Sequence, residues 1–330
     1  MNLSRRDFMK TSAGAAAAGL VSTAAAKTPE EVVREVKFID IHAHATEGSF
    51  PNIGGRQILS RPEQLLAHYD RLGVEKGVLL GLGNPENFIG GMSTESILRI
   101  CKTYPGRFIP GCNIDPRACG NDPSVNFGDF IKRYRDLGCR LLGEVVANFP
   151  VSDPRLQNLF RGCEEAGIPL TFHMSSHRGF SYGIVDDPGM PQLELSLQRF
   201  PKLKIFGHSP AFWSEIGTYE TVDERNGYPK GPVKEEGAIP RLMRKYPNLY
   251  GDLSAGSGCR ALSRDPAYAA KFLTEFQDRI MFGLDICCPT GYVSPLPEFL
   301  RNLFLSGSIS EAVFRKVARG NQIRLLGLPS

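Results

Sequence analysis

The chain has 330 residues, of which 42% are hydrophobic and 22% are charged, with 35 glycines and 24 prolines. This composition is that of a globular protein and excludes a disordered, collagen-like or coiled-coil chain. The formal net charge is +4, but +2 of it comes from the first 26 residues, through Arg5, Arg6, Lys10 and Asp7. The remainder is nearly neutral, so we expect no nucleic-acid partner held by a basic face.

The N-terminus carries an export pattern. Residues 4–10 read Ser-Arg-Arg-Asp-Phe-Met-Lys, an Ala/Gly-rich apolar stretch follows, and Ala24-Ala25-Ala26 forms a small-residue cleavage site. This order is typical of a twin-arginine signal peptide, and the apolar stretch is too short for a membrane span. The alternative is a flexible Ala-rich tail. We expect residues 1–26 to pass through the twin-arginine machinery and residues 27–330 to act in the periplasm or outside the cell, with no membrane contact.

From Val36 onward, short apolar runs alternate with longer helical patterns. The runs are rich in Ile, Leu, Val and Phe, as in strands that are buried on both faces. The expected strands are Lys37–His42, Gly77–Leu82, Arg107–Cys112, Arg140–Val146, Pro169–His173, Leu203–His208, Asn248–Ser254 and Arg279–Asp285. The expected helices include Pro62–Leu72, Thr94–Tyr104, Phe127–Leu137, Arg155–Ala166 and Pro266–Phe276.

Eight strand–helix units in one composition regime predict an α/β fold, a single (β/α)8 TIM barrel over residues 27–330. An open doubly wound sheet is the alternative, but no G-x-G-x-x-G follows the first strand. Three long connections follow strands, at Ala45–Arg61, Met174–Pro188 and Ser209–Glu236. The third connection is either a lid or a dimerisation arm, so the protein is either a monomer or a homodimer.

Polar side chains stand at the carboxyl ends of several strands. Four of the six histidines do so, and acidic residues occupy two further strand ends. These residues are His42, His44, Glu144, His173, His208 and Asp285. Because the carboxyl ends of barrel strands share one rim, we expect them to converge. Buried imidazole and carboxylate groups are costly unless they are paired or bind metal.

This donor set predicts a divalent metal site. Imidazole and carboxylate together favour zinc first, with manganese, iron or cobalt as alternatives, over calcium or magnesium. The competing interpretation is a buried ionic network without a metal.

The arrangement resembles the amidohydrolase superfamily, and most closely its amidohydrolase-2 branch. The resemblance rests on Phe38-Ile39-Asp40-Ile41-His42-Ala43-His44, on Phe200–Ile205 before His208, and on Gly320–Leu328. It implies that His42 and His44 bind a first metal together with Asp285, and that His173 is the next ligand. It also implies that His208 binds a second metal or orients substrate and water.

Glu144 departs from family members that carry a lysine on the fourth strand. It is similar instead to the Gly-Glu of TatD-like barrels, where the glutamate is a metal ligand. One or two metal ions therefore remain open.

Such a site lowers the pKa of a bound water and polarises a carbonyl. The sequence therefore predicts a hydrolase of small-molecule esters, lactones or amides, with Asp285 and His208 as catalytic residues. The first alternative is a non-oxidative decarboxylase of a small carboxylic acid, in which His173 or Asp285 carries the proton. Weaker alternatives are a TatD-like phosphoesterase and a non-catalytic metal-binding protein.

Three further residues are substrate-contact candidates: His177, Arg178 and Trp213. Asp252 is expected to hydrogen-bond a ligand histidine. Cys287 and Cys288 are expected to line the pocket.

Overall fold

The computed structural model describes residues 27–329, apart from residues 49–54, 87–91, 121 and 180–181. The expected signal peptide lies outside these described residues. The strands are β1 (Phe38–Ala43), β2 (Val74–Leu79), β3 (Phe108–Pro110), β4 (Leu142–Val145), β5 (Leu170–Ser175), β6 (Ile184–Val185), β7 (Ile205–His208), β8 (Leu249–Asp252) and β9 (Ile280–Met281). All their pairings are parallel, in the orders β1-β2-β3 and β4-β5-β7-β8-β9, with β6 beside β5.

Backbone hydrogen bonds join the two sheets at both edges. Between β3 and β4, the Cys112 N–H donates to the Leu141 carbonyl at 2.9 Å. Between β9 and β1, the Ile41 N–H donates to the Phe282 carbonyl at 3.1 Å, and the Asp285 N–H donates to the His42 carbonyl at 2.9 Å. The main strands thus follow one another in a ring of the TIM-barrel type, as the sequence predicts.

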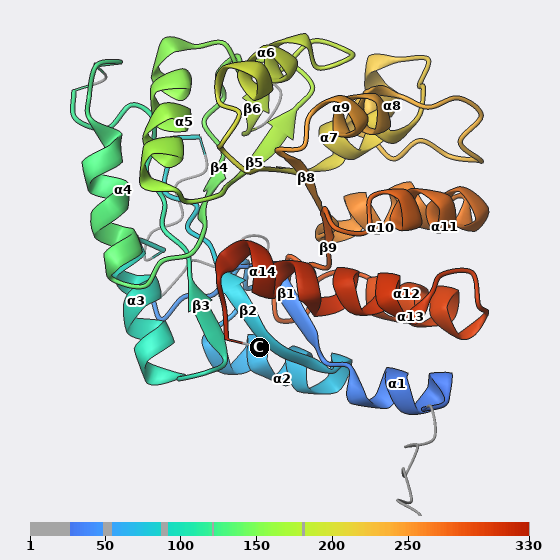
Figure 1. The fold of residues 1–330 in the computed structure, drawn as a ribbon. Coiled ribbons are helices and arrows are strands. Elements are labelled where there is room, and N and C mark those ends of the chain that lie inside the picture. Colours follow the sequence, from blue (N-terminus) through green and yellow to red (C-terminus); the bar gives the residue numbers. More distant parts are fainter. Residues whose placement is uncertain (1–26, 49–54, 87–91, 121, 180–181, 330) are drawn as a thin grey trace, which may run out of the picture.

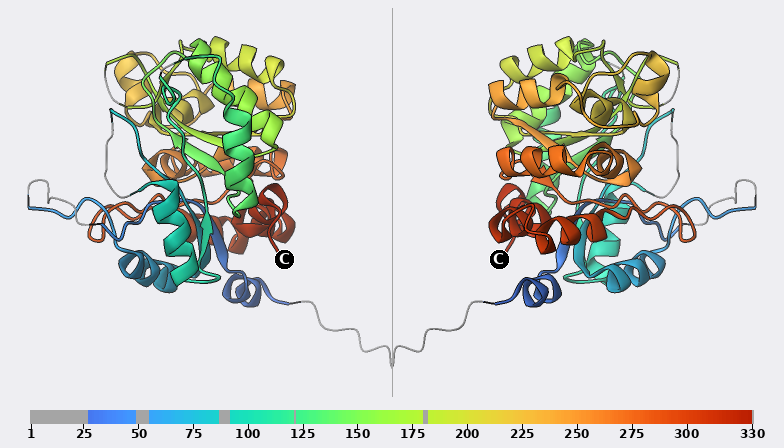
Figure 2. Two further views of the ribbon diagram at one scale, coloured as in Figure 1. Left: turned by 90° about the vertical axis from the view of Figure 1, so that its left-hand side faces the viewer. Right: turned by 90° about the vertical axis from the view of Figure 1, so that its right-hand side faces the viewer.

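Helices cover the outside of this ring on all sides (Figures 1 and 2). They are α1 (Pro29–Glu35), α2 (Pro62–Leu72), α3 (Thr94–Thr103), α4 (Phe127–Asp136), α5 (Pro154–Ala166), α6 (Pro191–Arg199), α7 (Pro210–Trp213), α8 (Val222–Asn226), α9 (Ala238–Lys245), α10 (Ala255–Ser263), α11 (Pro266–Glu275), α12 (Leu296–Leu305), α13 (Glu311–Arg315) and α14 (Asn321–Leu326). Side chains of Ser93, Asp153 and Asp265 accept backbone N–H groups and so begin α3, α5 and α11. None of the helices among the described residues has the length and apolar character of a membrane span.

Six of the eight expected strands lie within two residues of their observed bounds, and β2 and β9 differ by more. Strand β2 begins at Val74 rather than Gly77, because Gly73 ends α2 in the left-handed conformation (φ 79°) and the chain enters the sheet at once. Strand β9 stops at Met281 instead of reaching Asp285. Beyond it the chain leaves regular pairing, and Asp285 itself has a left-handed φ of 52°.

The long connections after β5 and β7 contain helices and a strand of their own. The stretch Met174–Pro188 contains β6, and Ser209–Glu236 contains α7, α8 and a short 3-10 helix, Ser214–Ile216. A buried ion pair between Arg225 and Glu215, 3.0 Å apart, lies within the second of these connections. Arg225 also donates to the Asp186 carbonyl at 2.8 Å, which ties the two connections together.

The barrel interior is filled by one apolar cluster. Its members are Ile39, Ile41, Val78, Leu80, Ile109, Leu141, Phe206, Tyr250, Met281, Leu325 and Leu326. The Gln322 side-chain amide donates to the carbonyls of Ile39 and Phe282, at 3.0 and 3.1 Å. Through Gln322 the C-terminal helix α14 thereby holds β1 beside the residues that follow β9.

Candidate metal centre

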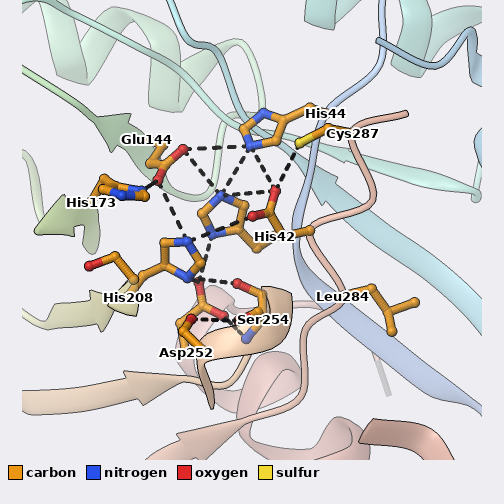
Figure 3. A network of polar contacts seen from close by, with 12 residues as sticks. His42, His44, Glu144, His173, His208, Asp252, Ser254, Leu284 and Cys287 are labelled. Carbon is orange, nitrogen blue, oxygen red and sulfur yellow. Dashed lines mark hydrogen bonds and ion pairs between the residues drawn. The ribbon is translucent and has the colours of Figure 1, made fainter. Parts of the chain in front are cut away.

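Two histidines at the end of β1 face each other through their Nε2 atoms, which are 3.1 Å apart (Figure 3). The Nδ1 atom of His42 lies 2.7 Å from a carboxylate oxygen of Asp252, and that of His44 lies 3.0 Å from the Leu80 carbonyl. Both partners accept hydrogen bonds, so each Nδ1 carries the proton in the neutral ring. Each Nε2 then directs a lone pair at the other, an arrangement that a shared cation satisfies.

Two carboxylates complete this first group of donors. Glu144 Oε2 lies 3.5 Å from His42 Nε2 and 3.6 Å from His44 Nε2. Asp285 Oδ1 lies 3.3 Å from His44 Nε2 and 4.0 Å from His42 Nε2. Ligands bonded at about 2.1 Å to one ion lie between about 3.0 Å and about 4.2 Å from each other, depending on the angle at the ion. His42, His44 and Glu144 form one group with metal-ligand spacing, and Asp285 lies beside it next to His44.

The second oxygen of Glu144 faces another pair of histidines, and that of Asp285 faces one of them. Glu144 Oε1 lies 2.9 Å from His173 Nδ1 and 3.7 Å from His208 Nε2. Asp285 Oδ2 lies 3.8 Å from His208 Nε2. Glu144, His173 and His208 form a further group with metal-ligand spacing. All six residues expected to converge are thus brought together, with Glu144 between two groups of nitrogen donors.

The pKa values of the cluster keep its two carboxylates ionised. Burial would raise the pKa of Glu144, but His42 and the hydrogen bond from His173 hold it well below its usual range. The same balance holds for Asp285: burial would raise its pKa, but His42 and His44 lower it to about 2. For His44, burial lowers the pKa, but hydrogen bonds to Asp285 and Glu144 outweigh it and raise the pKa to about 9. Buried ionised carboxylates of this kind suit a bound cation.

His208 differs from the other histidines of the cluster. Burial and the neighbouring His42 lower its pKa to about 4, so its ring is neutral at ordinary pH. Its Nδ1 lies 2.9 Å from the hydroxyl of Ser254. Its Nε2 is directed at the carboxylates of the cluster.

Buried aspartates hold the β1 end in place. Asp252 makes the expected hydrogen bond to a histidine of the cluster, His42, and such a contact holds the ring in one orientation. Asp40, which the sequence analysis overlooked, accepts the backbone N–H groups of His42 and Leu284 at 3.0 and 2.8 Å. It also accepts the Tyr69 hydroxyl at 2.8 Å. An acidic residue inside an apolar strand was the available signal, because such a group needs partners.

The three substrate candidates have different positions. His177 and Arg178 are exposed in the segment after β5. Trp213 is only 1% exposed, and its indole N–H donates to the Asp252 carbonyl at 2.7 Å. Its ring packs against Phe212 and Phe272. The expectation that Trp213 contacts substrate is therefore corrected: this side chain belongs to the core beneath the cluster.

Tyr182, which carried no sequence signal, also lies near the cluster, together with one of the two cysteines expected at the pocket. The Tyr182 ring lies 4.5 Å from the His173 ring. The Cys287 thiol donates to Asp285 Oδ1 at 3.3 Å, whereas Cys288 donates to the Ile58 carbonyl at 3.1 Å. Of the two adjacent cysteines, only the first thus contacts the cluster.

Fold and site together define a TIM-barrel protein with a polar centre at the carboxyl ends of its strands. Residues 39–328 match the family model described as Amidohydrolase, so the chain belongs to this family. Residues 2–22 match the twin-arginine translocation pathway signal sequence. A comparison with curated protein sequences found no match.

Solved structures share the fold at low sequence identity. An uncharacterised TIM-barrel protein from Bordetella bronchiseptica has 21% identity and a TM-score of 0.57, over 88% of this chain and 98% of its own. The 5-carboxyvanillate decarboxylase of Novosphingobium aromaticivorans, solved with manganese and a nitrobenzoic acid, has 17% identity and a TM-score of 0.59, over 89% and 97%. A probable 2-pyrone-4,6-dicarboxylic acid hydrolase from Acinetobacter baumannii has 12% identity and a TM-score of 0.54, over 88% and 100%.

Proposed function

We propose that the protein is a metal-dependent hydrolase that acts on an ester, lactone or amide carbonyl of a small molecule. The observation that carries this proposal is the position of Glu144. Its two carboxylate oxygens are divided between His42 and His44 on one side and His173 and His208 on the other. A carboxylate shared in this way suits a pair of ions, the arrangement used by many hydrolytic sites.

In this proposal a first divalent ion is held by His42, His44, Glu144 and Asp285. A second ion is held by His173 and His208, together with the other oxygen of Glu144. When bound, such ions supply Lewis acidity and lower the pKa of water to near neutrality. The aspartate that orients His42 keeps the Nε2 lone pair aimed inward.

The chain's own groups can move the proton. Asp285 is held ionised, so its carboxylate can accept a proton from the attacking water. Its Oδ2 lies 3.8 Å from Nε2 of His208. Where a single ion leaves that nitrogen free, the neutral His208 can take the proton onward to the leaving group; where His208 holds a second ion, Asp285 itself returns the proton.

Non-oxidative decarboxylation of a small carboxylic acid is the second candidate. It is favoured by the similar structures, because the Novosphingobium enzyme is named a decarboxylase and was solved with manganese. This reaction needs a protonated group that delivers its proton to carbon, and Asp285 or His173 would carry it.

We also propose that residues 1–26 are removed after twin-arginine export, and that the mature chain acts in the periplasm or outside the cell. The match of residues 2–22 to the signal-sequence model supports this proposal. Subcellular fractionation, with N-terminal sequencing of the exported form, tests both parts.

Metal content and turnover test the proposed reaction. We expect about two ions per chain and hydrolysis of lactones, esters or amides in the parent, and fewer ions with little turnover in Glu144→Gln and His173→Ala. Glu311→Gln, which removes the same charge from an exposed position at the start of helix α13, is the matched control. About one ion, unchanged in Glu144→Gln, together with release of carbon dioxide from aromatic acids, would favour decarboxylation instead. Absence of bound metal after reconstitution would contradict both reactions.

A further inference from the structure

One thiol lies within the donor cluster itself. Cys287 Sγ, a carboxylate oxygen of Asp285 and a ring nitrogen of His44 lie within 4.8 Å of one another. The sulfur is 3.3 Å from Asp285 Oδ1, and that same oxygen is 3.3 Å from His44 Nε2. Figure 3 shows the thiol directed toward the His44 side of the cluster.

The backbone fixes the thiol in this position. The Ser60 N–H donates to the Cys287 carbonyl at 2.6 Å, on the strand-end side of the barrel. The side chain packs beside Tyr182 against a small apolar cluster formed by Leu59, Leu82, Met92 and Val146. The sulfur therefore reaches the cluster from a wall formed mainly by apolar side chains.

We propose that Cys287 is a ligand of the ion that His44 and Asp285 hold, binding it as the thiolate. This inference rests on the proposed metal site and adds a soft donor to it. A sulfur–metal bond of about 2.3 Å beside oxygen and nitrogen bonds of about 2.1 Å places such donors about 3.1–3.6 Å apart. The Sγ–Oδ1 separation of 3.3 Å falls in this range. Binding replaces the S–H bond by a sulfur–metal bond, and the proton leaves to water without any redox change.

A thiolate changes which metal the site prefers. Imidazole and carboxylate donors alone accept manganese, zinc, iron or cobalt, whereas thiolate selects softer ions such as zinc. We therefore infer that this chain favours zinc over manganese, and that Cys287 is the residue responsible. A ligand contributes at least as much as an outer-shell partner, whose loss costs 10–100-fold in metal affinity. Cys287→Ser is thus expected to weaken zinc binding about tenfold or more and manganese binding less, which lowers the zinc-over-manganese preference.

Cobalt(II) substitution of the whole protein tests the ligand directly, because a thiolate on cobalt gives an intense near-ultraviolet charge-transfer band. We expect this band in the parent and its loss in Cys287→Ser and Cys287→Ala, with cobalt still bound. The adjacent Cys288→Ser is the matched control, since its thiol donates to the Ile58 carbonyl rather than to the cluster. Zinc–manganese competition on the same proteins gives the preference.

The outcomes separate this inference from the proposed function. Cobalt bound without the band in the parent would overturn the role of Cys287 while leaving a hydrolase site intact. A band that persists in Cys287→Ser but disappears in Cys288→Ser would also overturn it. A protein that binds the metal through Cys287 but hydrolyses no substrate would support the inference and contradict the hydrolase.

Discussion

Replacing Asp252 by asparagine should weaken metal binding although the residue touches no ion. Its Oδ2 lies 2.7 Å from His42 Nδ1, and its Oδ1 accepts the Ser254 backbone N–H at 2.9 Å. If the asparagine amide nitrogen faces His42, the ring must move its proton to Nε2, which removes the lone pair aimed into the cluster. If the amide oxygen faces His42 instead, two N–H donors meet at Ser254. Neither orientation satisfies every partner.

The magnitude follows from burial and from the role of the contact. Asp252 is 1% exposed, so water cannot replace the lost hydrogen bond. Loss of such an outer partner costs 10–100-fold in metal affinity, or about 1.4 to 2.7 kcal/mol. We therefore expect the dissociation constant of zinc to rise within this range in Asp252→Asn.

Competition with a chromophoric chelator measures this change. Asp186→Asn is the matched control, because Asp186 is also 1% exposed but accepts the backbone N–H groups of Gln192 and Leu193 instead of a ring nitrogen. The control should lose stability without losing metal affinity. Equal zinc affinity in Asp252→Asn and the parent, with both folded, would refute the argument that Asp252 fixes the tautomer of His42.

Two further predictions concern stability. Burial raises the pKa of Asp40 from 3.8 to about 7, so its ionised form destabilises the folded chain. The penalty is absent below pH 3.8, grows with rising pH and is complete above pH 7, at about 4 kcal/mol. The stability of Asp40→Asn relative to the parent should thus increase from pH 5 to pH 8, as measured by urea unfolding after chelation. A constant difference in the free energy of unfolding across this range would contradict the reasoning. Trp213→Phe leaves the Asp252 carbonyl without its buried donor and should cost about 2 kcal/mol or more in chemical denaturation, whereas a loss below about 0.5 kcal/mol would show that the indole N–H is dispensable.

Local sequence patterns were sufficient for most elements. Helix α2 runs over Pro62–Leu72 as expected, because Pro62 can begin a helix and Gly73 ends it in a left-handed conformation. The pattern was less informative where a partner strand decides the length. Strand β9 is limited to Ile280–Met281, since the residues beyond it bond to β1 and to the Asp40 carboxylate.

The convergence of the six donor residues was also predictable, because parallel barrel strands place their carboxyl ends on one rim. Distances between donor atoms were not. Whether Glu144 faces one group of histidines or two depends on side-chain orientation, and only the folded structure shows its oxygens divided between them. Asp40 escaped notice for a related reason: its three donors come from β1, α2 and the segment after β9.

The sequence by itself determined the family, the alternation of strands and helices and the residue types at the strand ends, because these depend on local periodicity and short motifs. Only the tertiary structure decided that Trp213 supports the core instead of meeting a substrate. It also decided that Cys287, and not its neighbour Cys288, reaches the cluster. Successive side chains in an irregular segment point in directions that depend on the packing of distant segments, and no local pattern contains that information.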